Sequence, residues 1–491
     1  MSASLTAAPP ARSTPARYGI ALAVVVAGQT MILIDEMIVN IALPGMSAEL
    51  ALDPVALSWV INAYLLTFGG LLLLGGRAGD ILGRRKVFLA GVALFSVACL
   101  ARGLATEPWM LITARAVQGV GAALTAPCVL ALIVSMFAEG PLRRRAIAVY
   151  TAVGGLGAAL GLLLAGTLTS ASSWRWVLML NVPIGALVLL CAPFVVRETE
   201  PNPGRFDVAG ALTSALGVGA LVWALSAAGS EGWGSPTVQG LIAAGVVLLL
   251  AFVAIERRAR QPIVVPRLFA DRNRVCAYLA VLLVQGSQIG QLFFLTQFFQ
   301  QGLGFSPLVA ALAFLPVTVT LLALAGAVVK LQPKVGARPL VVLGAAMLVA
   351  SNLLLSRLDL DTTYATDVLP ALLLLGAGIA LGTIPATVLG TSGVDDDETG
   401  SASSMISATT TLGASLALAV LVTVMTAAST RAAGSVPADL PQEAIGGYVF
   451  LRGMSASFVA GGAFALATLV VALFIRRSTN TRPTPVGPDR P

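Results

Sequence analysis

The sequence contains no histidine, and only 11% of its 491 residues carry a charge. The absence of histidine excludes a histidine-based metal site or proton relay. The shortage of charge excludes an ordinary soluble domain, in which about 25% of residues are charged. The four cysteines form no Cys-x-x-Cys pair and are read as small apolar packing residues. We therefore expect neither a metal nor a cofactor.

Several functional classes lack their sequence signatures. No phosphate-binding loop of the form G-x-x-x-x-G-K-[ST] occurs, which excludes an ATP-driven pump. A membrane enzyme or sensor needs a catalytic cluster or a soluble domain, and neither is found, so we do not expect an enzyme. The net charge of +7 comes without a basic face or an aromatic-interleaved patch, so we expect no nucleic-acid partner.

Long apolar runs occupy most of the chain, which is 57% hydrophobic and has a mean hydropathy of +0.90. Each run has roughly 18 to 27 residues, enough for a helix to cross a hydrocarbon core of about 30 Å. The short alternating segments of a membrane β-barrel are absent from the sequence. We therefore predict an all-α polytopic membrane protein. Its fourteen expected transmembrane helices cover 18–44, 55–76, 87–106, 109–137, 146–169, 175–196, 207–228, 237–255, 275–301, 307–329, 339–357, 367–390, 402–429 and 449–475.

The basic residues indicate the orientation in the membrane. Most of the 30 Lys and Arg fall in alternate loops, which the positive-inside rule places in the cytoplasm together with both termini. Arg115 lies inside a span. Five more arginines are assigned to the opposite, outer loops: Arg102, Arg175, Arg357, Arg431 and Arg452. Arginine outnumbers lysine amid abundant alanine and glycine, which favours a GC-rich bacterial genome and hence a bacterial inner membrane.

Two charged, proline-containing segments divide the spans into groups of six, two and six. They are 197–207 and 256–274. The stretches 71–94 and 321–344 both run from a span through a short basic loop into the next span. This similarity indicates either an internal repeat or a chance match of two basic loops. Secondary transporters are often built from two such six-helix halves. We predict an N-terminal six-helix bundle (1–200), two linking transmembrane helices (201–265) and a C-terminal six-helix bundle (266–491).

Two adjacent carboxylates lie deep in the first span. An ionised side chain at the centre of a membrane helix costs about 2.5 to 3.5 kcal/mol, and only Asp35, Glu36 and Arg115 are placed that deeply. The acids are interpreted either as a proton-binding site or as buried structural partners of Arg115. On a helical wheel Glu36 shares a polar stripe with Asn40, whereas Asp35 shares its face with Met31 and other apolar residues.

Other polar residues in the spans suggest a hydrated cavity. Arg115 and Gln118 share a face of the fourth span, which favours a cavity role over an arginine that reaches to the membrane interface. Gln288 and Gln291 in the ninth span indicate either a wet face or polar contacts that hold helices together. The predicted substrate cavity therefore includes Asp35, Glu36, Asn40, Gln118, Gln288 and Gln291.

Several motifs together identify a family resemblance. They are LIDEMIVNIALP at the end of the first span, the loop GRAGDILGRRK (76–86), ARAVQGVGAA, WRWVLMLNVPIG and QGLGFSPLVAALAFLP. With these, essentially the whole chain resembles the fourteen-helix drug/proton antiporter branch of the major facilitator superfamily. The resemblance implies alternating access between two bundles, with export of amphiphilic compounds driven by inward proton flow. It implies proton coupling at Asp35 and Arg115 and a conformational switch loop at Gly76, Asp80, Gly83 and Arg84. To these we add Glu36 as an accessory proton-coupling acid or a countercharge for the substrate.

The sequence departs from the family pattern in the fifth span. That span usually carries Gly-Pro followed by Gly-Gly, whereas here Gly161-Leu162 and Ala165-Gly166 stand at these places. The missing proline leaves open an alternative, a proton symporter or uniporter that imports a small metabolite. In either case the expected partners are a small-molecule substrate, protons and the lipid bilayer, and the expected state is a monomer.

Overall fold

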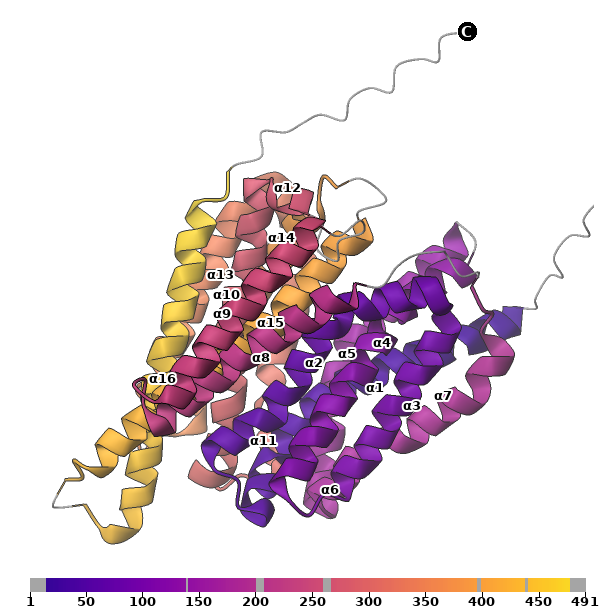
Figure 1. Ribbon diagram of the computed structural model, residues 1–491. Coiled ribbons are helices and arrows are strands. Elements are labelled where there is room, and N and C mark those ends of the chain that lie inside the picture. Colours follow the sequence, from indigo (N-terminus) through magenta and orange to yellow (C-terminus); the bar gives the residue numbers. More distant parts are fainter. Residues whose placement is uncertain are drawn as a thin grey trace, which may run out of the picture.

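A computed structural model describes residues 15–137, 140–199, 207–258, 266–394, 399–437 and 440–476. In these ranges the chain forms helices joined by turns and loops, without a strand (Figure 1). Thirteen helical segments in them have the length and hydropathy to cross a membrane. The remaining predicted span, 146–169, lies within a 31-residue helix, about 46 Å long at 1.5 Å per residue. The predicted all-α membrane fold is confirmed. Both termini and the predicted boundaries near 200 and 265 lie outside the described residues.

The first group of helices packs into one bundle through contacts of α1 with α4, α5 and α7 and of α4 with α2 and α3. Apolar residues dominate these helices, and prolines occupy the first turn of several, where no N–H is needed. The bundle contains α1 (Pro15–Leu50), α2 (Pro54–Leu82), α3 (Arg84–Gly103), α4 (Pro108–Met136), α5 (Pro141–Ala171), α6 (Trp174–Met179) and α7 (Asn181–Val195).

A second bundle forms around α10, which contacts α14, α15 and α16. Two of its predicted spans are interrupted: the helix pair α11/α12 breaks at Phe314 before a proline, and α10 ends in a π-helical turn. The elements are η1 (Pro266–Phe269), α10 (Arg272–Gln297), η2 (Phe298–Gly302), α11 (Pro307–Ala313), α12 (Leu315–Val335), α13 (Ala337–Leu355), η3 (Tyr364–Val368), α14 (Leu369–Thr391), α15 (Thr399–Ala433) and α16 (Gln442–Leu473).

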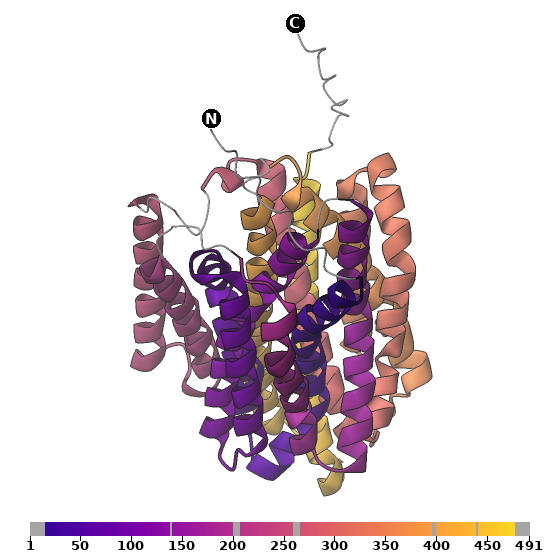
Figure 2. The same cartoon turned by 90° about the vertical axis from the view of Figure 1, so that its right-hand side faces the viewer.

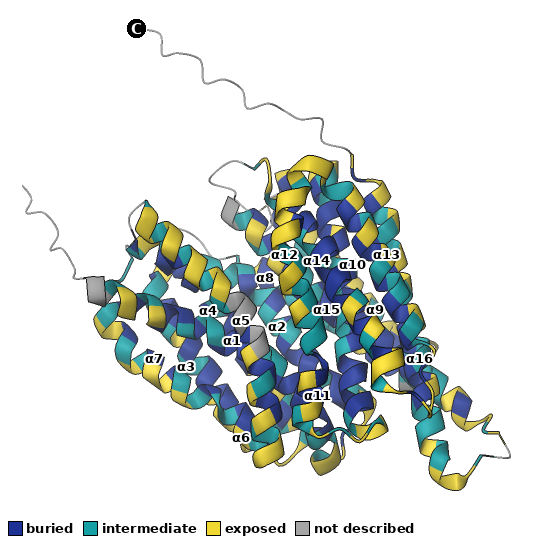
Figure 3. Ribbon diagram, turned by 180° about the vertical axis from the view of Figure 1, so that it is seen from behind, coloured by how far each residue is buried: buried dark blue, intermediate teal, exposed yellow. Residues whose placement is uncertain are grey.

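Two further helices, α8 (Val208–Glu231) and α9 (Pro236–Arg258), stand together at one edge of the molecule (Figure 2). α8 packs against both α2 and α15, and α9 packs on α8. The pair therefore covers the seam between the two bundles without entering the centre. Exposed residues lie mainly on the outward faces of the helices (Figure 3), where large apolar side chains such as Phe194 (81% exposed) suit contact with lipid.

The two bundles touch at the end predicted to face outward. The outer half of α5 packs on α11, whereas α5 has little contact with α12. The backbone N–H of Leu308 donates to Ser170 Oγ at 3.0 Å, and Gln300 Nε2 donates to the Ile41 carbonyl at 3.0 Å. Halfway along, Ser415 Oγ donates to Asn62 Oδ1 at 3.1 Å across the α2–α15 seam. These contacts seal the predicted outer end.

Candidate functional site

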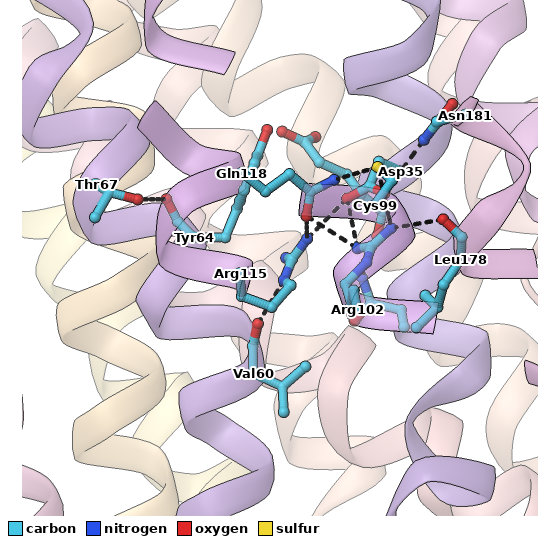
Figure 4. Close-up of polar contacts among 12 residues, drawn as sticks. Asp35, Val60, Tyr64, Thr67, Cys99, Arg102, Arg115, Gln118, Leu178 and Asn181 are labelled. Atoms are coloured by element: carbon cyan, nitrogen blue, oxygen red, sulfur yellow. Dashed lines mark hydrogen bonds and ion pairs between the residues drawn. The ribbon is translucent and has the colours of Figure 1, made fainter. Parts of the chain in front are cut away.

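Asp35 lies at the centre of a buried charge cluster, defined here as Asp35, Arg102 and Arg115 (Figure 4). Arg102 Nη2 donates to Asp35 Oδ1 at 2.6 Å, and Arg102 Nη1 donates to Oδ2 at 3.2 Å. Arg115 Nη1 donates to Oδ2 at 2.7 Å, and Asn181 Nδ2 donates to Oδ1 at 3.3 Å. The carboxylate is fully buried, and both of its oxygens accept two hydrogen bonds.

The structure corrects the placement of Arg102, which the sequence assigned to an outer loop. Arg102 is in the last turn of α3 and is fully buried. Its side chain points into the first bundle, where it also donates to the Leu178 carbonyl at 3.1 Å. An arginine near the end of a span ordinarily reaches to the membrane interface. Here Asp35 supplies a countercharge inside the protein, so the guanidinium turns inward.

Arg115 connects the charge cluster to the centre of the molecule. Its Nε donates to the Val60 carbonyl at 2.7 Å, and its Nη1 also donates to Gln118 Oε1 at 2.8 Å. The guanidinium lies over the ring of Tyr64, 4.4 Å from the centroid. Gln118 accepts from Arg102 as well, at 3.0 Å, so one amide oxygen holds the two guanidinium groups together. Arg115 and Gln118 thus lie on one face of α4, as their spacing predicts, and both point into the first bundle.

A cavity of about 140 Å³ lies between the two bundles. Its polar wall includes Glu36 and Asn40 from α1, Tyr64 from α2, Arg115 from α4 and Gln288 from α10. The remaining wall is largely apolar and is contributed by α1, α2, α10 and α15: Met37, Val39, Ile61, Leu65, Ile289, Leu292 and Ala414. An apolar wall with a few polar groups is the lining typical of a site for a small organic molecule, whereas the volume is below the roughly 300 to 1,000 Å³ of most such sites.

The predicted cavity residues separate into two groups. Glu36, Asn40 and Gln288 line the cavity, together with Gln285. By contrast, Asp35, Gln118 and Gln291 are fully buried behind its wall. Their exclusion has a physical cause, because each polar group is held by a neighbour within its own bundle: the two arginines hold Asp35 and Gln118, while Gln291 Oε1 accepts from Ser351 at 2.8 Å.

The four residues assigned to the conformational switch lie where α2 meets α3, and the structure corrects the predicted loop 76–86, because only Gly83 lies outside a helix. Gly76 and Asp80 belong to the last turns of α2, and Arg84 begins α3. Gly83 ends α2 and begins α3 with a φ of 100°, a conformation that favours glycine. Asp80 forms an ion pair with Arg84 at 3.0 Å within its own turn, and Gly76 faces Pro127 of α4. All contacts that the described residues give Asp80 are therefore local to the first bundle.

The segment after α7 caps the beginning of α3. The backbone N–H of Arg85 donates to Glu198 Oε1 at 3.0 Å, and that of Arg84 donates to Thr199 Oγ1 at 3.0 Å. These bonds satisfy two N–H groups that a helix start leaves free, and the carboxylate also complements the helix dipole. The two bonds connect the start of α3 to the segment that follows α7.

Replacing Glu198 with Ala is expected to lower the free energy of unfolding by about 0.5 to 2 kcal/mol, the range for loss of a helix cap. Thermal unfolding of the purified protein measures the change. Glu107→Ala is the matched control, because Glu107 occupies the N-cap position of α4 without a capping hydrogen bond. Equal stability of the Glu198→Ala and Glu107→Ala proteins would contradict the capping role.

Sequence reasoning missed three members of the site. Arg102 was hidden by its position near the end of a span, and Asn181 by its place at the break between α6 and α7. Tyr64, whose hydroxyl has no hydrogen-bond partner among the described residues, lies in the predicted span 55–76, where no pattern singles it out. A signal for Arg102 did exist, because two deep carboxylates, Asp35 and Glu36, stand against the single deep cation Arg115, which leaves one negative charge unbalanced.

Known proteins resemble this chain in sequence and in fold. The model of the Major Facilitator Superfamily matches residues 25–418. The puromycin resistance protein pur8 of Streptomyces alboniger is 38% identical over 481 residues, which cover 96% of this chain and 94% of that protein. The cephamycin export protein CmcT of Amycolatopsis lactamdurans is 40% identical over 399 residues, 80% of this chain and 82% of that protein. Among solved structures, an auto-inhibited POT family peptide transporter superposes with a TM-score of 0.68 at 18% identity, covering 96% of this chain and 99% of that one, a likeness of fold.

Proposed function

Because the chain belongs to the Major Facilitator Superfamily, we propose that it is a proton-coupled antiporter that exports small amphiphilic or cationic antibiotics. The observation that carries this proposal is the similarity, over nearly the whole chain, to a puromycin resistance protein, with a cephamycin export protein also among its relatives. Membership of this family supports a multi-pass membrane transporter and not an enzyme. The setting is a bacterial inner membrane, with the termini in the cytoplasm and the protein acting as a monomer.

The arrangement of the helices supports alternating access as the mechanism. Contacts between α5 and α11 seal the predicted outer end, while α5 and α12 hardly touch nearer the predicted cytoplasmic end. We assign this arrangement to an inward-facing state, in which the cavity between the bundles receives substrate from the cytoplasm. Rocking of one bundle against the other would then open the α5–α11 contact and release substrate outside.

The proposed division of labour follows the two groups of polar residues. Glu36, Asn40 and Gln288 line the cavity and are assigned to substrate contact. Asp35, Glu36 and Arg115 are assigned to proton coupling. Ionisable groups inside a membrane protein are energetically costly, and their presence therefore indicates a function. Gly76, Asp80, Gly83 and Arg84 form the switch loop. The absence of the usual proline in α5 leaves open the alternative, import by symport or uniport.

Export is tested in inside-out membrane vesicles that contain the full-length protein. An acidic lumen is expected to drive severalfold accumulation of two probes, ethidium and radiolabelled puromycin, and collapse of the pH gradient by an ionophore should abolish it. Vesicles without the protein provide the baseline. Accumulation that persists after the gradient collapses would contradict proton coupling, and probe movement only out of the vesicles would favour the import alternative.

A further inference from the structure

The two adjacent acids of α1 have opposite surroundings. Asp35 is fully buried and accepts four hydrogen bonds, three of them from guanidinium groups. Glu36 is half-buried and lines the cavity, and the described part of the chain gives its carboxylate no hydrogen bond and no ion pair. Successive residues of a helix point about 100° apart, which is why one acid faces the interior of the bundle and its neighbour faces the cavity.

These surroundings make protonation of Asp35 costly. A proton on either oxygen must displace a donor that already occupies it, since both oxygens accept two bonds. Neutralising Asp35 would also leave Arg102 and Arg115 as two buried cations with no anion between them. Removing one partner of a buried ion pair is strongly destabilising, so Asp35 is suited to remain ionised throughout a transport cycle.

Protonation of Glu36 breaks no contact of this kind. The charged or titratable groups around it are Asp35 on its own helix, Tyr64 on α2 and Arg115 on α4. The walls from α10 and α15 present no charged side chain, and their polar residues are Gln285, Gln288, Thr410 and Thr411. A proton can therefore enter or leave Glu36 from the cavity without rearranging either bundle.

Arg115 provides a link between Glu36 and the charge cluster. Its Nε and Nη1 are bonded to Val60, Asp35 and Gln118, whereas its Nη2 makes no hydrogen bond to the described residues. Arg115 and Glu36 both line the cavity. An ionised Glu36 can attract Nη2 and balance the second positive charge of the cluster, and a protonated Glu36 releases it. The charge on Glu36 thereby controls the position of Arg115.

From these contacts we propose that Glu36, not Asp35, is the carboxyl group that takes up and releases the coupled proton, while Asp35 stays ionised as the fixed counterion of the two arginines. A cationic substrate would compete with that proton for the same carboxylate, which gives exchange of one for the other. The inference rests on the proposed function, because it names the residue that performs the coupling.

Infrared difference spectroscopy of the purified full-length protein in lipid tests the assignment without a substrate. Exposed carboxyls are largely ionised above about pH 6, so the protonated-carboxyl band that changes between about pH 6 and pH 8 reports a perturbed group. We expect that band in the wild type and in the matched control Glu49→Gln, and its loss in Glu36→Gln. A band that survives in Glu36→Gln, or no band in the wild type, overturns the assignment.

The vesicle assay separates failure of this inference from failure of the proposed function. We expect Glu36→Gln to lose accumulation driven by the pH gradient while downhill ethidium flux remains, and Glu36→Asp to recover part of the coupling. Gradient-driven export by the wild type that Glu36→Gln fully retains would overturn the role of Glu36 but leave antiport intact. A Glu36-dependent infrared band without any gradient-driven transport would overturn antiport instead.

Discussion

Replacing Asp35 with Asn is expected to cost about 3 to 5 kcal/mol of stability, the range for removing one partner of a buried ion pair. The amide cannot balance Arg102 and Arg115, which lie with their Nη atoms 2.6 and 2.7 Å from the present carboxylate and are almost completely buried. We expect a large drop in melting temperature and in the yield of folded protein in membranes, and transport should be lost. Thermal unfolding in detergent with a lipid supplement measures the change.

A second variant shows whether the stability lost in Asp35→Asn comes from unbalanced charge or from the altered side chain. Adding Arg102→Gln to Asp35→Asn removes one charge of each sign and leaves Arg115 with the carboxylate of Glu36 in the neighbouring cavity. Much of the lost stability is then expected to return, so that the two substitutions are strongly non-additive. Glu49→Gln is the control on the same helix, because its ion pair with Arg175 is partly exposed and contributes little. Additive losses of stability in the double variant would contradict stabilisation by charge balance between Asp35 and the two arginines.

Much of the fold was accessible from the sequence because lipid imposes a simple rule on it. Every backbone polar group inside the membrane must be satisfied within its own helix, so long apolar runs predict the spans directly. Prolines within the spans indicate possible bends, but the sequence does not decide which of them interrupts a helix, because proline is tolerated in membrane helices and its effect depends on neighbouring helices. Thus α12 begins beside Pro316, whereas Pro127 and Pro385 lie inside continuous helices.

The candidate site was predictable only in part, and the helical wheel explains which part. Periodicity correctly separated Glu36 and Asn40 from Asp35, because the angle between neighbours on a helix does not depend on the rest of the fold. Arg102 could not be located in this way. Its inward direction depends on the position of Asp35 in another helix, 67 residues away in sequence. The periodicity of one helix carries no information on which residue of another helix its side chains will contact.

Gly166→Val is expected to prevent closure of the outer end and to abolish transport. A Cβ atom at Gly166 would lie 2.8 Å from Ala311 Cβ, 2.9 Å from Leu308 Cα and 3.0 Å from the Pro307 carbonyl oxygen. Two of these neighbours are backbone atoms of the other bundle, so they cannot move aside without separating α5 from α11. The substitution acts at the interface and not inside a bundle, and we therefore expect each bundle to remain folded while the population shifts toward an outward-open state.

Spin-label distances across the outer end measure that shift. Labels at Thr106→Cys and Leu360→Cys, both exposed and in different bundles, should give a longer distance distribution when Gly166→Val is added, in a background without the native cysteines. Gly326→Val is the matched control, since a Cβ there meets nothing within 4 Å. An unchanged distribution with intact transport would show that α5 and α11 need no close approach. A longer distribution confined to Gly166→Val would instead make the small residue of α5 a requirement for closing the outer end, a role that the glycine fulfils here without the proline usual in that stretch.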